Sequence, residues 1–150
     1  MTPRLSIVCS SLEGQARLER IAAELLGRMP PDMAARLARR VMVFALDGTR
    51  HAAFAQGLGG PHDATEQLAR EHVRQGQGGT DTRAETLALI VLQLDARWRQ
   101  SLEHTFAHEL GHVELGHTDA AAVAAAPLTD EELTERERAA DEWAARYLAW

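Results

Sequence analysis

Lysine and asparagine are absent from this 150-residue chain, cysteine occurs once, and aromatic residues make up only 5% of it. The single cysteine, Cys9, excludes an intramolecular disulfide framework and is typical of proteins in a reducing compartment, so we predict a cytoplasmic location. No apolar run approaches the ~20 residues that a membrane-spanning helix needs, and the apolar stretch 5–9 is too short for a secretion signal. We therefore expect no membrane partner.

Positive charge is also scarce. All 16 basic residues are arginines, and 22 acidic residues give a formal net charge of −6 at pH 7. An acidic chain without basic runs argues against direct nucleic-acid binding, because contacts to phosphates require clustered positive charge. Since 45% of the residues are hydrophobic and no linker divides the chain, we expect a single domain over residues 1–150.

Hydrophobic periodicity predicts an α+β order of elements. Strands are expected at 4–9, 41–46, 49–54 and 87–94, with a hairpin turn at Asp47-Gly48 joining the middle two. Helices are expected from residue 10 or 11 to 26, and at 31–40, 63–75 and 96–115. A last helix is expected to begin at the capping box Thr129-Asp-Glu-Glu132 and to run to the end of the chain.

The predicted helix at 96–115 carries an H-E-x-x-H motif, His108-Glu-Leu-Gly-His112. Two histidines four residues apart on a helix lie about 40° apart around its axis and about 6 Å apart along it, so both rings can bind one ion. Glu109 is then next to the open coordination position. The apolar stripe of this helix faces another way and is expected to pack on the sheet; it comprises Leu102, Phe106, Leu110 and Val113. Two solvated surface histidines are the alternative interpretation.

A catalytic zinc ion usually takes three protein ligands, and the motif supplies two. His104 lies about 12 Å from His112 along the helix axis, which is too far for both to share an ion with His108. His117 lies beyond Gly116 and off the side of the helix that carries the ligand pair. Neither of these two histidines is therefore expected to be the third ligand.

The last predicted helix offers two carboxylates instead. Glu137 falls in the middle of its expected apolar face, and Asp141 lies one turn further at the edge of that face. Because a buried carboxylate without a partner is costly, we predict that Glu137 binds the metal and that Asp141 accepts the ring N–H of a ligand histidine. The alternative is that Arg136 or another arginine pairs with them. The expected apolar face comprises Leu133, Ala140, Ala144, Tyr147 and Leu148.

Together these segments resemble the ImmA/IrrE zinc metallopeptidases, whose pattern is HELGH followed on the next helix by E-x-x-A-[ND]-x-F-A-x-x-L-L. Here HELGH is followed by Glu137-Arg-Ala-Ala-Asp141-Glu-Trp-Ala-Ala-Arg-Tyr-Leu148, with Trp143 in place of Phe and Tyr147 in place of the first Leu. The resemblance covers residues 105–148. It implies a minimal zincin-like, gluzincin-type domain, in which a small sheet packs on the HELGH helix and a C-terminal helix brings the third ligand.

The resemblance also implies a ligand set. His108, His112 and Glu137 would bind Zn²⁺, Asp141 would support a ligand histidine, and Glu109 would be the catalytic residue. Zinc is favoured because two imidazoles, one carboxylate and an open position are its usual catalytic set, although a similar set also suits non-haem iron.

The sequence therefore predicts a zinc-dependent metallo-endopeptidase that acts on a protein substrate or regulatory partner of the repressor or toxin type. Glu109 is expected to take a proton from the attacking water and to pass it to the leaving amine. His104, Tyr147 and Arg138 are candidate donors to the oxyanion. The strand at 87–94 is either an edge strand that receives an extended peptide or a core strand.

Two other functions remain compatible with the same residues. One is a zinc-binding regulatory protein with little or no turnover, and the other is a zinc hydrolase that acts on small amides. The sequence leaves the oligomeric state open.

Overall fold

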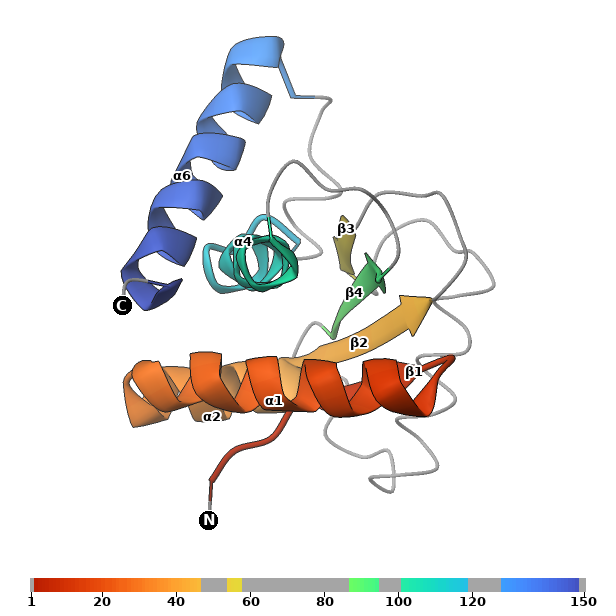
Figure 1. Ribbon diagram of the computed structural model, residues 1–150. Helices are drawn as coiled ribbons and strands as arrows, with labels where there is room; N and C mark the ends of the chain where they lie inside the picture. The colour runs from red at the N-terminus through yellow and green to blue at the C-terminus, as the bar shows by residue number, and fades with distance from the viewer. Residues whose placement is uncertain (1, 47–53, 58–86, 95–100, 119–127, 149–150) are drawn as a thin grey trace.

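The computed structural model describes residues 2–46, 54–57, 87–94, 101–118 and 128–148. Its elements, in chain order, are β1 (Ser6–Cys9), α1 (Leu12–Arg28), α2 (Pro31–Arg40), β2 (Val41–Leu46), β3 (Phe54–Gly57), β4 (Ala88–Gln93), α4 (Leu102–Glu114) and α6 (Asp130–Leu148). The predicted α+β class is confirmed (Figure 1). The predicted helix at 63–75 and the turn at Asp47-Gly48 lie outside the described residues.

The four strands form one sheet in the order β1-β2-β4-β3. β1, β2 and β4 are parallel, whereas β3 pairs antiparallel with β4, and Phe54 lies opposite Val91. The predicted hairpin between 41–46 and 49–54 is therefore wrong, because β4 lies between β2 and β3. The continuous apolar run of β4 suits a strand that is buried on both faces, so β4 is a core strand rather than an edge strand.

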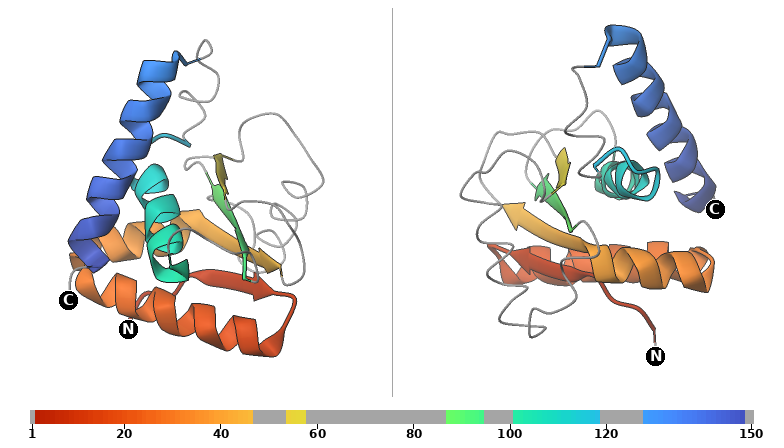
Figure 2. Two further views of the ribbon diagram at one scale, coloured as in Figure 1. Left: turned by 45° about the horizontal axis from the view of Figure 1, so that its top comes forward. Right: turned by 180° about the vertical axis from the view of Figure 1, so that it is seen from behind.

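Side chains of β2 and β4 alternate between the two faces of the sheet, as the period of a strand requires. Val43 and Ile90 point into the main core and are fully buried, whereas Met42 and Leu89 belong to a smaller apolar cluster on the other face. Helices α1, α2 and α4 bury their apolar sides in the main core. Helix α4 lies between the sheet and α6 in all three ribbon views (Figures 1 and 2).

Helix α4 carries the H-E-x-x-H motif and begins later than the sequence predicts. Ser101 is its N-cap, and the Ser101 hydroxyl accepts a hydrogen bond from the His104 backbone N–H at 3.2 Å, so the predicted start at residue 96 is wrong. The helix ends at Glu114, and Gly116 follows with a φ of 79°, a left-handed conformation that favours glycine. The predicted apolar stripe is confirmed, since Leu102, Phe106, Leu110 and Val113 are all buried.

Helix α6 begins with the predicted capping box. The Thr129 hydroxyl accepts from the Glu132 backbone N–H at 3.2 Å, and the Glu132 carboxylate accepts from the Thr129 backbone N–H at 2.8 Å. The predicted apolar face is correct in its second half only. Ala140 and Ala144 are buried and Trp143 joins them, but Leu133 is 48% exposed because the first turns of α6 extend beyond the core.

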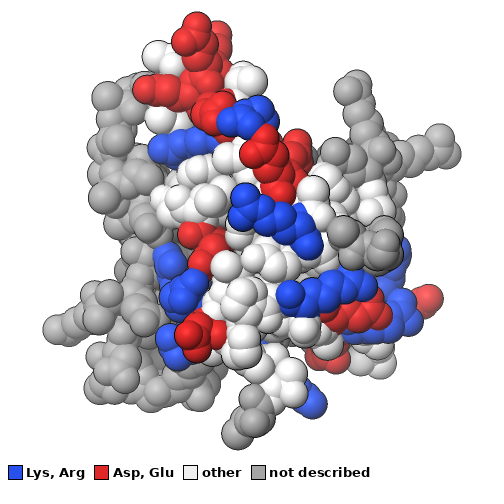
Figure 3. Space-filling model, turned by 90° about the vertical axis from the view of Figure 1, so that its left-hand side faces the viewer, with Lys and Arg blue, Asp and Glu red and all other residues white. Residues whose placement is uncertain are grey.

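The α6 side of the molecule carries mixed charge (Figure 3). Acidic side chains gather where α6 begins, at Asp130, Glu131 and Glu132, and they suit the positive end of the helix dipole. Farther along α6, Arg138 forms ion pairs with Glu135 and Glu142. None of the helices described is both long and apolar enough to cross a bilayer.

The outer edge of β1 is covered by a side chain of α1. The Gln15 carbonyl oxygen accepts from the Cys9 backbone N–H at 2.9 Å, and the Gln15 amide donates to the Ile7 backbone carbonyl at 2.7 Å. This side-chain amide thus makes the two hydrogen bonds that the backbone of a further strand would make.

Candidate metal centre

The two motif histidines lie one turn apart on α4, on the side that faces α6. Their Nε2 atoms are 3.0 Å apart, and each side chain is only 13% exposed. They lie apart from the apolar stripe, which packs on the sheet and leaves this side of the helix to α6. The histidine pair is therefore not solvated at the surface, which contradicts the alternative interpretation.

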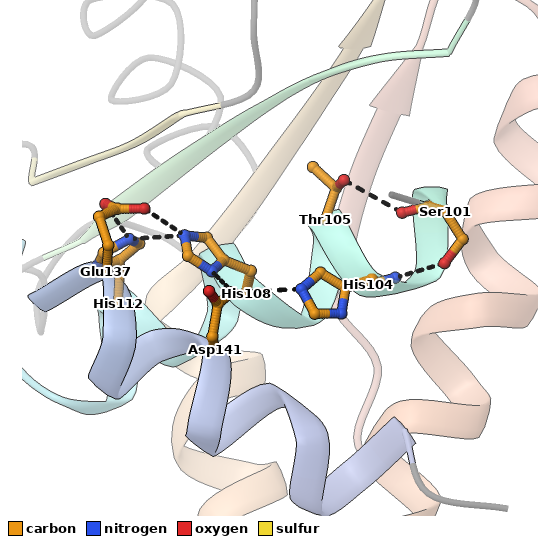
Figure 4. A network of polar contacts seen from close by, with 7 residues as sticks. All are labelled: Ser101, His104, Thr105, His108, His112, Glu137 and Asp141. Atoms are coloured by element: carbon orange, nitrogen blue, oxygen red, sulfur yellow. Dashed lines mark hydrogen bonds and ion pairs between the residues drawn. The ribbon is translucent and has the colours of Figure 1, made fainter. Parts of the chain in front are cut away.

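Helix α6 brings Glu137 to the same point (Figure 4). One oxygen of the Glu137 carboxylate is 3.0 Å from His108 Nε2, and the other is 3.1 Å from His112 Nε2. The two helices approach closely because residue 111 is glycine. A Cβ atom at Gly111 would lie 3.1 Å from the Ala140 backbone oxygen and 3.1 Å from the Trp143 ring.

The burial argument for a metal at Glu137 is only partly right. The side chains of Glu137 and Asp141 are 61% and 49% exposed, so neither is the buried carboxylate that the apolar face of α6 predicts. Both residues nevertheless point toward the α4 histidines, as predicted, and neither forms an ion pair with an arginine in the described part of the chain. Their convergence, rather than their burial, sets them apart from other acidic residues.

Asp141 lies behind His108, on the opposite side of the ring from Glu137. Asp141 Oδ1 is 2.7 Å from His108 Nδ1 and 3.2 Å from His104 Nε2. Partial burial acts to raise the pKa of Asp141, but the hydrogen bonds from His108 and His104 outweigh it and hold that pKa below its ordinary value. The ionised carboxylate accepts Nδ1–H of His108 and thereby leaves the Nε2 lone pair of His108 free.

His112 has a different neighbour behind it, the imidazole of His117. The two Nδ1 atoms are 2.8 Å apart, and the His117 backbone N–H donates to the His112 carbonyl at 3.0 Å. The sequence predicts that His117 is not a ligand of the same ion, and it assigns His117 no role. The feature of the sequence that points to this contact is Gly116, whose left-handed conformation turns the chain back toward α4.

Both rings of this pair favour the neutral form. Burial lowers the pKa of His112 to about 4, and the charge of His108 acts in the same direction, while Glu137 opposes it. Burial also lowers the pKa of His117, and the positive charge of Arg136 acts in the same direction. Neutral imidazole is the form that binds metal ions.

The three groups that converge are two imidazole rings, each through its Nε2 atom, and one carboxylate, through both of its oxygens. The ring proton of His108 is committed to Asp141, so a single ring proton, that of His112, is left to serve three contacts of 3.0–3.1 Å. A cation among the three side chains would satisfy all of these contacts at once. Ligand atoms around a tetrahedral zinc ion are about 3.3 Å apart, so the residues present fit a bound metal ion closely. His108, His112 and Glu137 thus form one group that could hold a metal ion.

The remaining predicted residues lie as follows. Glu109 is buried on α4, 7% exposed, and takes part in interactions there. The three candidate oxyanion donors all have partners: His104 contacts Asp141, the Tyr147 hydroxyl contacts Met33 Sδ at 3.5 Å, and Arg138 pairs with glutamates of its own helix.

Comparisons with known proteins found no matching family model, no matching curated protein and no matching solved structure.

Proposed function

We propose that this chain is a zinc-dependent metallopeptidase with a minimal zincin-like domain, of the kind that its HELGH and Glu137–Leu148 segments resemble. The observation that carries the proposal is the convergence of His108 Nε2, His112 Nε2 and the Glu137 carboxylate, all 3.0–3.1 Å apart. These residues come from two helices and are separated by up to 29 positions in the sequence, yet they present only metal-ligating atoms to one another.

Zinc is the metal that we propose. Two neutral imidazoles and one carboxylate are a common ligand set of catalytic zinc, and a hydrogen-bonded carboxylate behind a ligand histidine, as at Asp141, is the usual supporting arrangement. Non-haem iron takes a similar set, so the metal content of the purified protein distinguishes the two.

When bound, zinc would supply Lewis-acid chemistry that polarises a carbonyl group and makes water a better nucleophile near neutral pH. The role that we propose for Glu109 is that of general base. It would take a proton from the attacking water and return it to the amide nitrogen as the peptide bond breaks. The support for this role is the place of Glu109 in the H-E-x-x-H motif, directly after the proposed ligand His108.

Two observations favour a protein substrate over a small amide. Glu137 is 61% exposed, so the side of the site that its carboxylate forms faces solvent, where a large molecule could approach. The strand β3 pairs only with β4 among the described strands, and we propose that its other edge receives an extended peptide by strand addition. The edge strand of this proposal is thus β3 and not the strand at 87–94.

The experiment is elemental analysis of the purified wild type beside Glu137→Ala, followed by a peptide-hydrolysis assay of Glu109→Gln. We expect about one zinc ion per wild-type chain and its loss in Glu137→Ala, because two histidines alone bind weakly. We expect Glu109→Gln to keep its zinc and to lose hydrolysis. Zinc that stays fully bound in Glu137→Ala would refute the proposed ligand set, and full activity of Glu109→Gln would remove Glu109 from the role of base.

A further inference from the structure

The two histidines of the proposed site are supported in different ways. Behind His108 stands a carboxylate, that of Asp141, at 2.7 Å, whereas behind His112 stands a second imidazole, that of His117, at 2.8 Å. A carboxylate can only accept a hydrogen bond from a ring, but an imidazole offers either an acceptor or a donor. The direction of the hydrogen bond between His112 and His117 therefore decides which ring nitrogen of His112 carries the proton.

If His112 donates through Nδ1, its Nε2 lone pair points at Glu137 and His108 and is free to bind a metal ion. If His117 donates instead, the proton of His112 lies on Nε2, where it points at the Glu137 oxygen 3.1 Å away and blocks metal binding. A metal ion at the proposed site therefore requires His117 to be the acceptor.

The position of His117 is fixed by the backbone around it. The His117 backbone N–H donates to the His112 carbonyl at 3.0 Å, and the Arg136 side chain of α6 donates to the His117 carbonyl oxygen at 3.4 Å. Gly116, with a φ of 79°, makes the turn that brings the ring back over His112. The backbone of His117 is thus bonded to both α4 and α6, and its ring contacts His112.

We propose that His117 is a positioning residue that accepts the Nδ1–H of His112 and so presents Nε2 of His112 to the metal ion. This inference rests on the proposed zinc site. His117 itself lies outside the group of three ligand residues.

Three variants at this position test the proposal by their zinc affinity, measured by competition with a chromophoric chelator. His117→Leu removes the acceptor, and we expect the zinc affinity to fall about 10- to 100-fold, as is usual when a partner behind a ligand histidine is lost. His117→Asn places an amide oxygen where Nδ1 stood, and we expect it to keep most of the wild-type affinity. His117→Gln, whose amide lies one bond further out, is expected to fall between the two.

A spectroscopic measurement separates positioning from a merely structural role. In ¹⁵N-labelled, zinc-loaded protein we expect a slowly exchanging Nδ1–H resonance of His112 in the wild type and in His117→Asn. The same resonance should exchange rapidly with water in His117→Leu. The melting temperature of each metal-free variant, measured beside it, reports any general loss of folding.

Each outcome has one meaning. Equal zinc affinity in the wild type and His117→Leu overturns the inference but leaves the proposed zinc site intact. An Asn variant as weak as the Leu variant, with an unchanged melting temperature, also overturns it, because the acceptor would then not matter. A wild type that binds no zinc refutes the proposed function, and the inference with it.

Discussion

Asp141 Oδ1 lies 2.7 Å from His108 Nδ1 and so fixes the ring of His108 from the side opposite Glu137. The same oxygen is 3.2 Å from His104 Nε2, which makes Asp141 the common partner of two α4 histidines one turn apart. His104 is too far from His112 to share a metal ion with it. It contributes to the site indirectly, by contacting the Asp141 carboxylate that orients His108.

Asp141→Ala tests this relationship. We expect the zinc affinity to fall about 10- to 100-fold, because the His108 ring loses both its orientation and the proton acceptor that keeps Nε2 free. Glu142→Ala is the matched control: Glu142 is the next residue on α6, is exposed, and pairs with Arg138 instead of a histidine. A zinc affinity that falls equally in both variants would show that the effect comes from α6 in general and not from the Asp141–His108 contact.

Gly111→Ala tests the close approach of α4 and α6. The added Cβ atom would lie 3.1 Å from the Ala140 backbone oxygen, so α6 must shift and carry Glu137 away from the two histidines. We expect about a tenfold loss of zinc affinity, comparable with the loss of an outer-shell partner. Alanine also favours a helix by about 0.5–1 kcal/mol relative to glycine, and this gain opposes the cost of the close contact. The free energy of unfolding of the metal-free protein should therefore change little.

Gly27→Ala is the control for that experiment. Gly27 lies in the last turn of α1, and a Cβ atom there would have nothing within 4 Å. We expect this variant to be stabilised by up to about 1 kcal/mol, with an unchanged zinc affinity. Unchanged zinc affinity in Gly111→Ala as well would mean that the spacing of the two helices does not control the site.

The stability of the metal-free protein should fall in mild acid. The pKa of His112 is about 4 in the folded protein, against about 6.5 in an unfolded chain, so between these values the unfolded chain binds a proton that the folded protein does not. The free energy of unfolding therefore decreases as the pH falls from 6.5 to 4, by at most about 3 kcal/mol from this group, and levels off below.

Urea unfolding of chelator-treated protein at several pH values measures this dependence. His112→Gln has no ring to titrate, and we expect a clearly shallower decrease between pH 6.5 and 4. The pKa of Asp141 lies below its ordinary value, so Asp141 lowers the free energy of unfolding only in stronger acid. There, protonation of its carboxylate breaks the contacts to His104 and His108. The same slope in His112→Gln and in the wild type would show that other groups cause the decrease.

Thr129→Ala separates stability from metal binding. The Thr129 hydroxyl accepts from the Glu132 backbone N–H at the start of α6, and its loss should cost about 1 kcal/mol of unfolding free energy. Since the first turn of α6 is two turns away from Glu137, we expect zinc affinity to stay at the wild-type value. A parallel fall in zinc affinity would indicate that the site depends on the stability of α6 as a whole.

The local features of the site were predictable from the sequence, and the long-range ones were less so. The ligand pair on one side of α4, its opposite apolar stripe, and the capping box of α6 all follow from helical spacing. The position of β4 between β2 and β3 was not predicted, because the Asp47-Gly48 signal is local whereas the parallel pairing of β2 with β4 joins distant segments.

Two side-chain environments were also missed for a physical reason. Glu114 lies away from both the apolar stripe and the ligand pair of α4, yet it is only 13% exposed because Arg36 of α2 contacts it at 2.5 Å. Likewise, the pairing of His117 with His112 depends on the turn at Gly116, which helical periodicity does not describe. In both places the decisive partner lies outside α4.

The amide of Gln15 on the outer edge of β1 has a consequence for assembly. Because its carbonyl and NH₂ groups already occupy the Cys9 N–H and the Ile7 carbonyl, a second sheet cannot join the molecule at β1 without displacing them. Among the described strands, this leaves pairing at β3 alone. Strand pairing through the described sheet would therefore add one strand beside β3, from a single partner or from one copy of this chain, and would not continue from β1.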